Sequence, residues 1–229
     1  MTENAMTRPK DCFGITGGLS ATHIKITGVV MMVFDHVYYM FQTQGIPQWF
    51  HWIGRPVAPL FLFMCAEGFA HTRSRKRYIL QLLAGYEIMN VVSFLLGSAL
   101  PNENVILIFS IFGSLFFAAL YMLFADMFRR GIQTRRAGIS ALAFFFMLIP
   151  AAYGLVTVML LSANGASLPR WASLVLFKLV PNVMMVEGSL LWVVIALLFY
   201  LLRKNRLLQI LPLAAFGAVF FALKNIEWL

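Results

Sequence analysis

GISALAFFFMLIPAAYGLVTVMLL, residues 138–161, carries no charged side chain. A bilayer core about 30 Å thick requires about 20 apolar residues per helical span, so this stretch predicts a helix that crosses a membrane. Six further apolar runs flank it, separated by polar or Gly/Pro-rich breaks. The predicted spans are 24–42, 52–71, 78–98, 105–128, 138–161, 185–202 and 207–223. The sequence therefore predicts an all-α, polytopic transmembrane helical bundle of about seven spans.

The composition of the whole chain supports this class. Hydrophobic residues make up 61% of the 229 positions and charged residues 12%, whereas ordinary globular chains carry about 25% charged residues. These proportions exclude a disordered, a fibrous or a secreted disulfide-framework protein. The two cysteines, Cys12 and Cys65, lie too far apart in predicted membrane depth to suggest a pair, and the sequence holds no CxxC motif. We therefore predict no disulfide framework and no metal site.

The net charge of +9 is concentrated in short segments between the predicted spans. Basic clusters occur at 73–77, 129–136 and 203–206, and cytoplasmic loops of membrane proteins are enriched in Lys and Arg. The clusters therefore set the topology and require no nucleic-acid partner. We predict a multi-pass protein of the cell (inner, cytoplasmic) membrane with a cytoplasmic N-terminus and an external C-terminus. The expected organisation is one integral membrane domain, 1–229, that comprises a polar segment 1–23, a bundle 24–223 and a tail 224–229.

Two stretches depart from a plain bundle. The segment 171–180 is apolar but too short to span a bilayer, Lys178 interrupts it and Pro181 follows it. We therefore expect an interfacial or re-entrant helix on the outer face. The second span opens with Arg55-Pro56 and contains Pro59. Because proline lacks a backbone N–H and clashes with the preceding helical turn, we expect a kinked or delayed start there.

Ionisable side chains inside a predicted span are functional candidates, because each costs several kcal/mol to place in a bilayer. The first span contains Lys25, Asp35 and His36. His36 follows Lys25 by close to three helical turns, so both occupy one helix face about 16 Å apart in depth. Taken alone, Lys25 is best explained as a snorkelling lysine at the interface. His36, with Asp35 beside it, favours a functional histidine over one that merely satisfies a neighbouring helix.

The second and third spans add further ionisable groups. Glu67 and His71 are four residues apart and share one face of the second span, which has Arg55 near its outer end. Glu87 lies about 13 Å inside the third span by helix rise. Two carboxylates and a histidine from three spans can therefore meet in the inner half of the bundle. That arrangement is typical of a buried acid/base site or of a proton relay.

Three other candidates have ordinary structural explanations. Contact with the neighbouring basic loop accounts for Asp126 near the inner end of the fourth span. The helix dipole accounts for Glu187 at the start of the sixth span. Cys65 is better explained as a small buried hydrophobic residue than as an acyl-accepting nucleophile.

Four segments together resemble the TraX family of inner-membrane proteins. They are IKITGVVMMVFDHVYYMF (24–41), WIGRPVAPLFLFMCAEGFAHTRSRKRYILQLL (52–83), YEIMN (86–90) and PNENVILIF (101–109). The residues that carry the resemblance are Lys25, Asp35, His36, Gly54, Arg55, Pro59, Phe61, Phe63, Glu67, Gly68, Phe69, His71, Thr72, Arg73, Glu87, Asn104 and Val105. Beyond residue 110 the similarity is mostly one of hydropathy.

The resemblance implies a membrane acetyltransferase. The named member of the family N-acetylates the amino-terminal residue of conjugative pilin. The ten-residue interval between Lys25 and His36 also resembles the signature of a larger superfamily of transmembrane acyltransferases, which take acetyl groups from cytoplasmic acetyl-CoA. One departure is visible, because Tyr86-Glu87-Ile88-Met89 stands where the family pattern has Ser-Glu-Ile-Pro. The departure concerns the local helix geometry and not the chemistry.

On this basis His36 is the expected general base. Asp35 is expected to line the cavity, and Glu67 or Glu87 to hold the imidazole tautomer. The loop 73–77 is the expected clamp for the phosphates of CoA, because guanidinium groups suit phosphate, although the topology rule explains the same charges. Arg55 is expected to face the acceptor or the forming oxyanion. The full set assigned to acetyl-CoA and its transfer is Lys25, Arg55, His71, Arg73, Arg75, Lys76 and Arg77.

Functions of another class fit the same residues. A proton-coupled transporter or flippase would place the acidic groups and His36 inside the bundle but would need no acetyl-CoA site. A non-catalytic assembly subunit would not depend on His36 at all. Within the enzyme class, the acceptor is a pilin or other exported peptide, or a cell-envelope glycan. The expected partners are acetyl-CoA, a peptide or glycan acceptor and the lipid bilayer, with no nucleic acid and with homo-oligomerisation left open.

Overall fold

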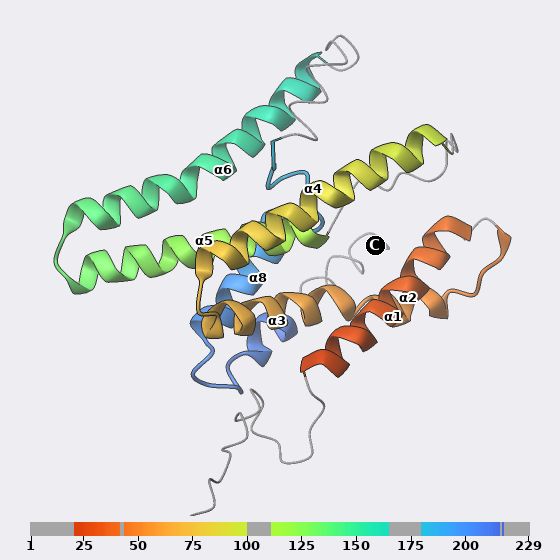
Figure 1. The fold of residues 1–229 in the computed structure, drawn as a ribbon, viewed down its shortest axis with the longest axis horizontal. Helices are drawn as coiled ribbons and strands as arrows, with labels where there is room; N and C mark the ends of the chain where they lie inside the picture. Colours follow the sequence, from red (N-terminus) through yellow and green to blue (C-terminus); the bar gives the residue numbers. More distant parts are fainter. Residues whose placement is uncertain (1–20, 42–43, 100–110, 165–179, 216, 218–229) are drawn as a thin grey trace, which may run out of the picture. The chain divides into compact units, whose positions relative to one another are not determined.

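The computed structural model describes residues 21–41, 44–99, 111–164, 180–215 and 217. Within these residues the chain forms seven bounded helices and no strand (Figure 1). The helices are α1 (Ala21–Phe41), α2 (Trp49–Gly54), α3 (Val57–His71), α4 (Arg75–Ala99), α5 (Ile111–Gln133), α6 (Ala137–Asn164) and α8 (Ser189–Leu201). The all-α prediction is therefore confirmed for the described part of the chain.

Among the residues that the structure describes, three helical stretches are long and apolar enough to cross a membrane. They are Trp49–His71, which comprises α2 and α3, Ile111–Gln133 and Ala137–Leu160. The apolar helix α8 is shorter, with 13 residues. These stretches confirm the expected membrane protein, whereas the count of seven spans stays a prediction.

Two further expected spans correspond to described helices, the first span to α1 and the third span to α4. Of the seventh expected span, only residues 210–215 and 217 are described as helix. The expected interfacial segment 171–180 lies outside the described residues up to position 179.

The expected irregular start of the second span is present. α2 ends at Gly54, a turn follows at Arg55 and Pro56, and α3 begins at Val57. The backbone N–H of Arg55 still donates to the carbonyl of His51 at 3.2 Å, but Pro56 has no N–H with which to continue the helical ladder. The proline therefore divides this stretch into two helices.

The chain divides into two compact units, Met1–Val57 and Ala58–Leu229. In the first unit α1 packs against α2 through aromatic side chains. The Phe34 ring lies 5.2 Å from the ring of Phe50 and 6.4 Å from that of Trp49, measured between centroids. The ring of Tyr38 stacks on His51 at 5.0 Å. This short aromatic interface fixes which residues of α2 face the end of α1.

In the second unit α5 is the central helix and packs against α4, α6 and α8. Its small and apolar residues Ala118, Ala119 and Met122 are completely buried. Of the span-like stretch of α5, 61% is buried inside the protein, against 11% for that of α6. Since the exposed surface of α6 is almost entirely apolar, a lipid bilayer is the environment that would cover it.

Candidate functional site

Asp35 and His51 form a close acid/base pair within the first unit. Nδ1 of His51 lies 2.9 Å from Oδ1 of Asp35, with side-chain exposures of 13% and 26%. Asp35 comes from α1 and His51 from α2, so the turn between these helices brings the two together. A carboxylate on Nδ1 of an imidazole selects the tautomer and directs the other ring nitrogen away from the pair.

Glycine at position 54 allows this approach. A Cβ atom at Gly54 would lie 2.6 Å from Oδ1 of Asp35 and still closer to its Cβ, so any larger residue would push the carboxylate away. Gly54 is buried at the last residue of α2. The Gly-Arg motif at 54–55 therefore has a packing role next to Asp35.

His36, the expected general base, is exposed, and it is held by its own helix. Its Nδ1 donates to the main-chain carbonyl of Met32 at 2.9 Å. With the proton on Nδ1, Nε2 carries the lone pair that a general base requires. The hydrogen bond to Met32 is sufficient to hold this tautomer of His36. That role was expected of Glu67 or Glu87. Those carboxylates belong to the second unit, and their meeting with His36 stays a prediction.

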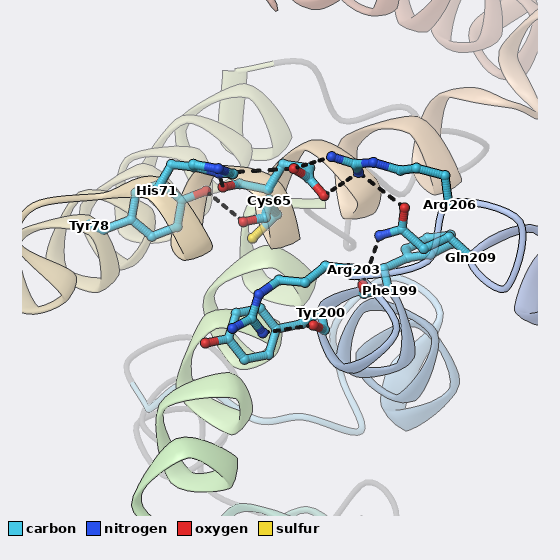
Figure 2. Close-up of polar contacts among 9 residues, drawn as sticks. Cys65, His71, Tyr78, Phe199, Tyr200, Arg203, Arg206 and Gln209 are labelled. Atoms are coloured by element: carbon cyan, nitrogen blue, oxygen red, sulfur yellow. Dashed lines mark hydrogen bonds and ion pairs between the residues drawn. The ribbon is translucent and has the colours of Figure 1, made fainter. Parts of the chain in front are cut away.

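Glu67, on α3, is 8% exposed and binds an arginine from the far end of the chain (Figure 2). Nη1 of Arg206 donates to Oε1 of Glu67 at 2.6 Å, and Nη2 donates to Oε2 at 3.2 Å. Arg206 also donates to Gln209, whose amide in turn donates to the carbonyl of Phe199. The hydrogen bond to Glu67 raises the pKa of Arg206. This network fastens the turn after α8 to α3.

His71 lies beside the same carboxylate but is not its main partner. Its Nδ1 donates to the main-chain carbonyl of Glu67 at 2.9 Å and is 3.9 Å from the carboxylate Oε2. The side chain of His71 is 58% exposed. Glu67 and His71 therefore share one helix face, as expected. The ion-pair partner of Glu67 is Arg206, which the sequence did not indicate.

Asp126 is a second anchor at the same end of this unit. Nη1 of Arg75 lies 2.6 Å from Oδ2 of Asp126, and the hydroxyl of Tyr200 donates to that same oxygen at 2.8 Å. Arg75 also lies over the ring of Phe69. Arg203 lies over the ring of Tyr200 (Figure 2). The expected ionic contact of Asp126 is present, but its partner is Arg75, the first residue of α4, rather than a residue of the neighbouring basic loop after α5.

The two anchors hold two basic segments, 73–77 and 203–206, at one end of the second unit. Among the expected CoA-binding residues, Arg75 is occupied by Asp126, whereas Arg73, Lys76 and Arg77 are exposed. Lys204, on the other segment, is exposed as well. A surface that presents several cations on segments fixed by a buried and a partly buried carboxylate suits a ligand with several phosphates.

The remaining expected site residues have separate environments. Glu87 is half-buried on α4 and is hydrogen-bonded to Asn90. No hydrogen bond or ion pair among the described residues joins it to Glu67. Lys25 and Arg55 are exposed in the first unit. Lys25 and Arg55 belong to a different unit from Glu67 and Glu87, so the gathering of the whole expected set into one site stays a prediction.

Cys65 has the surroundings of a packing residue. It is 3% exposed, and its Sγ points to the carbonyl of Leu115 at 3.6 Å. The hydroxyl of Tyr78 donates to the main-chain carbonyl of Cys65 at 3.3 Å. A thiol in this position is enclosed by α5, which favours the structural interpretation over an acyl-accepting nucleophile.

Sequence reasoning missed His51, Arg206 and Tyr200. His51 lies one position before the expected start of the second span, so it was not counted among the ionisable groups of the membrane. Arg206 was assigned to topology as part of a basic cluster. Tyr200 gave no signal, because a tyrosine in an apolar run is ordinary. A search for counter-ions to each carboxylate in a span would have directed attention to the arginines.

Comparison with known proteins gives one family match. The family model described as TraX protein matches residues 20–225. No curated protein and no solved structure matches the chain.

Proposed function

The chain belongs to the TraX family, and on that premise we propose that it is an integral membrane acetyltransferase. Membership suggests a function connected with conjugative pili. In the proposed reaction an acetyl group passes from cytoplasmic acetyl-CoA to an acceptor at the membrane. The acceptor is the N-terminal amine of a pilin or of another exported peptide.

The observation that carries this proposal is the pair of anchored basic segments. Arg206 on Glu67 and Arg75 on Asp126 hold segments 203–206 and 73–77 at one end of the unit. Exposed cations on both segments remain to bind phosphate, and CoA carries three phosphate groups. In this proposal Glu67 positions Arg206, because both carboxylate oxygens of Glu67 already accept hydrogen bonds from that arginine.

The proposed catalytic roles follow the resemblance. His36 is the general base, since its bond to Met32 leaves Nε2 to accept a proton. Asp35 with His51 and Glu87 with Asn90 are polar groups available to line the acceptor path. Lys25, Arg55 and His71 are assigned to the donor and to the forming oxyanion. Acetyl-CoA is the acyl donor, and no metal enters the proposal.

Two alternatives remain as competing proposals. A cell-envelope glycan is the second acceptor class, and acetyl-CoA binding would be the same for it. A proton-coupled transporter or flippase would use the ionisable groups as a relay and would need no cations for CoA. Binding of the thioester therefore separates the enzyme from the transporter, and an acceptor screen separates peptide from glycan.

The test is acetyl-CoA binding and thiol release by the purified protein in detergent. We expect micromolar-to-millimolar binding by wild type, slow release of free CoA thiol, and loss of release but not of binding in His36→Ala. A triple variant Arg73→Ala/Lys76→Ala/Arg77→Ala should weaken binding by about tenfold or more, since one charge-assisted phosphate contact contributes about 1.5–3 kcal/mol.

The matched control removes two exposed arginines from a different loop. Arg135 and Arg136 lie between α5 and α6 and are exposed, so Arg135→Ala/Arg136→Ala should leave binding unchanged. Equal loss in both variants would indicate a general charge effect. Absence of binding and of thiol release by wild type at millimolar acetyl-CoA would refute the enzyme and leave the transporter.

A further inference from the structure

The helix α4 carries a carboxylate beside an open, largely apolar face. One side of α4 packs against α5 (Figure 1). The other side is open, with exposed fractions of 62% for Leu80, 62% for Ile88 and 56% for Val91. Glu87 lies at the border between these two sides and is half-buried. The carboxylate therefore belongs to the packed part of the second unit and is still accessible to a ligand.

A hydrogen-bonded amide holds Glu87 in place. The side chain of Asn90, about one helical turn further along α4, is hydrogen-bonded both to Glu87 and to Tyr86. Tyr86 is 3% exposed. Its ring packs on α5 at Gly113, where a Cβ atom would lie 2.9 Å from the ring. The buried tyrosine thus fixes the amide, and the amide orients the carboxylate. A group held in this way loses little freedom when a ligand binds.

The charge of Glu87 favours a cationic ligand. The ion pairs among the described residues join other carboxylates, namely Asp35, Glu67 and Asp126. Asn90 gives Glu87 a hydrogen bond but no positive charge. Because an ionised carboxylate in a membrane span costs several kcal/mol, a cation that binds here gains the attraction of a weakly compensated charge.

The cations assigned to CoA lie on the same helix face. Lys76 is exposed and precedes Glu87 by about three helical turns, so both lie on one face of α4, ~16 Å apart by helix rise. Leu80 and Leu83 lie between them on this face. An extended chain with as many bonds as the pantetheine arm of CoA measures about 15 Å. A CoA molecule whose phosphates contact Lys76 can therefore bring its thioester to the level of Glu87.

The two acceptor classes differ in charge. The N-terminal amine of a peptide has a pKa of about 7.7–8.0, so most of it carries a positive charge at pH 7. A glycan hydroxyl carries no charge at that pH. A carboxylate at the level of the thioester can therefore distinguish a peptide amine from a glycan.

We propose that the carboxylate of Glu87 binds the protonated N-terminal amine of the acceptor and thereby selects an amine over a hydroxyl. This inference rests on the proposed acetyltransferase function and names the residue that determines its acceptor. Asn90 positions the carboxylate, and segment 73–77 of the same unit holds the donor. The selection requires no residue of the first unit.

The test measures thiol release from acetyl-CoA by the purified protein in detergent, with triglycine amide as the acceptor. N-acetyl-triglycine amide is the matched peptide without a charged amine, and maltotriose offers hydroxyls alone. Glu87→Gln keeps the size and the hydrogen bonding of the side chain and removes its charge. We expect this variant to raise KM for triglycine amide by about 10–100-fold, because a charge-assisted hydrogen bond is lost. KM for acetyl-CoA should not change.

The control variant moves the carboxylate along the helix. Gln81 is an exposed residue of α4, so Glu87→Gln/Gln81→Glu has the net charge of wild type. The double variant should keep the raised KM of Glu87→Gln, and Gln81→Glu alone should have the KM of wild type. A normal KM in the double variant would show a general charge effect and would overturn the role of Glu87.

A second measurement uses wild type alone and requires no turnover. Hydrogen exchange of residues 83–90 should slow with triglycine amide and should be unaffected by N-acetyl-triglycine amide. This comparison keeps the proposal testable if Glu87→Gln does not fold. Equal effects of the two peptides, or no effect of either, would overturn the proposed amine site.

The outcomes separate this inference from the function on which it rests. Wild type that releases thiol, together with a Glu87→Gln variant of normal KM for triglycine amide, overturns the role of Glu87 alone. Thiol release that maltotriose stimulates as strongly as triglycine amide overturns the selection of an amine and leaves the acetyltransferase. Wild type that neither binds nor cleaves acetyl-CoA overturns the proposed function and this inference together.

Discussion

The ion pair between Glu67 and Arg206 should stabilise the protein by a measurable coupling energy. Both carboxylate oxygens are engaged, at 2.6 and 3.2 Å. Loss of one member of a buried ion pair costs about 3–5 kcal/mol. The Glu67 side chain is 10% exposed, but that of Arg206 is 53% exposed, so solvent screens the pair. We therefore expect a coupling energy of about 1–2 kcal/mol, between the values for buried and for surface pairs.

A double-mutant cycle measures this energy directly. Glu67→Gln, Arg206→Gln and the double variant are unfolded reversibly in mixed micelles with increasing SDS. Each single variant should lose about 1–2 kcal/mol, and the double variant should lose little more than either one. For a chain of this length the corresponding fall in Tm is about 2–8 °C. The same variants should bind acetyl-CoA more weakly, because segment 203–206 loses its anchor.

The matched control cycle pairs Glu67→Gln with Lys204→Gln. Lys204 is an exposed neighbour in the same segment, so these two changes should add within about 0.3–0.5 kcal/mol. A coupling between Glu67 and Arg206 no larger than this control would refute the argument that the pair anchors the segment.

Four further predictions test other contacts. Gly54→Ala should lower the free energy of unfolding by about 1–3 kcal/mol through the clash with Asp35, whereas Gly138→Ala, where a Cβ meets nothing within 4 Å, should be neutral or slightly stabilising in the same melt. Asp35→Asn and His51→Gln should lower the rate of acetyl transfer to similar extents, with no further loss when combined; additive losses would show that the pair does not act as a unit. Tyr200→Phe should lower the free energy of unfolding by about 1 kcal/mol, since it removes one of the hydrogen bonds to Asp126, and an unchanged SDS midpoint would contradict that role. Cys65→Ala should retain thiol release, and native Cys65 should resist maleimide until the protein unfolds, because it is 3% exposed; rapid labelling of the native protein would contradict its enclosure by α5.

The helices could be predicted from the sequence because membrane helices depend on local properties. Length, hydropathy and the position of Pro56 indicate where α3 begins and roughly where α6 begins and ends, because these are properties of short stretches. The helix α5 continues to Gln133, beyond the expected end at 128. The second span was expected to start at residue 52, whereas its first helix, α2, starts at Trp49. The sequence does not decide between these starts, because two tryptophans and a histidine at this boundary fit a membrane interface as well as a helix.

The site could be predicted only as a set of residue types. Hydropathy indicates that Glu67 and Asp126 need partners, but not which cations provide them. Arg206 follows Glu67 by 139 positions, and only tertiary packing brings the two together. Helical spacing correctly placed Glu67 and His71 on one face, since that relation is local. The partnership of Asp35 with His51 depends on the turn after α1, and hydropathy contains no information on that turn.

The pairing of Glu67 bears on the choice between enzyme and transporter. A proton relay requires its carboxylates to gain and lose protons during each cycle. Protonation of Glu67 would remove the counter-ion of Arg206 and weaken both hydrogen bonds between them. The same holds for Asp126, which Arg75 and Tyr200 share. Glu67 and Asp126 thus have structural duties and Asp35 is paired with His51, so Glu87 is the one of these four carboxylates without an ion pair among the described residues. A relay reduced to so few carboxylates is a weaker explanation than a site that binds phosphates on its anchored cations.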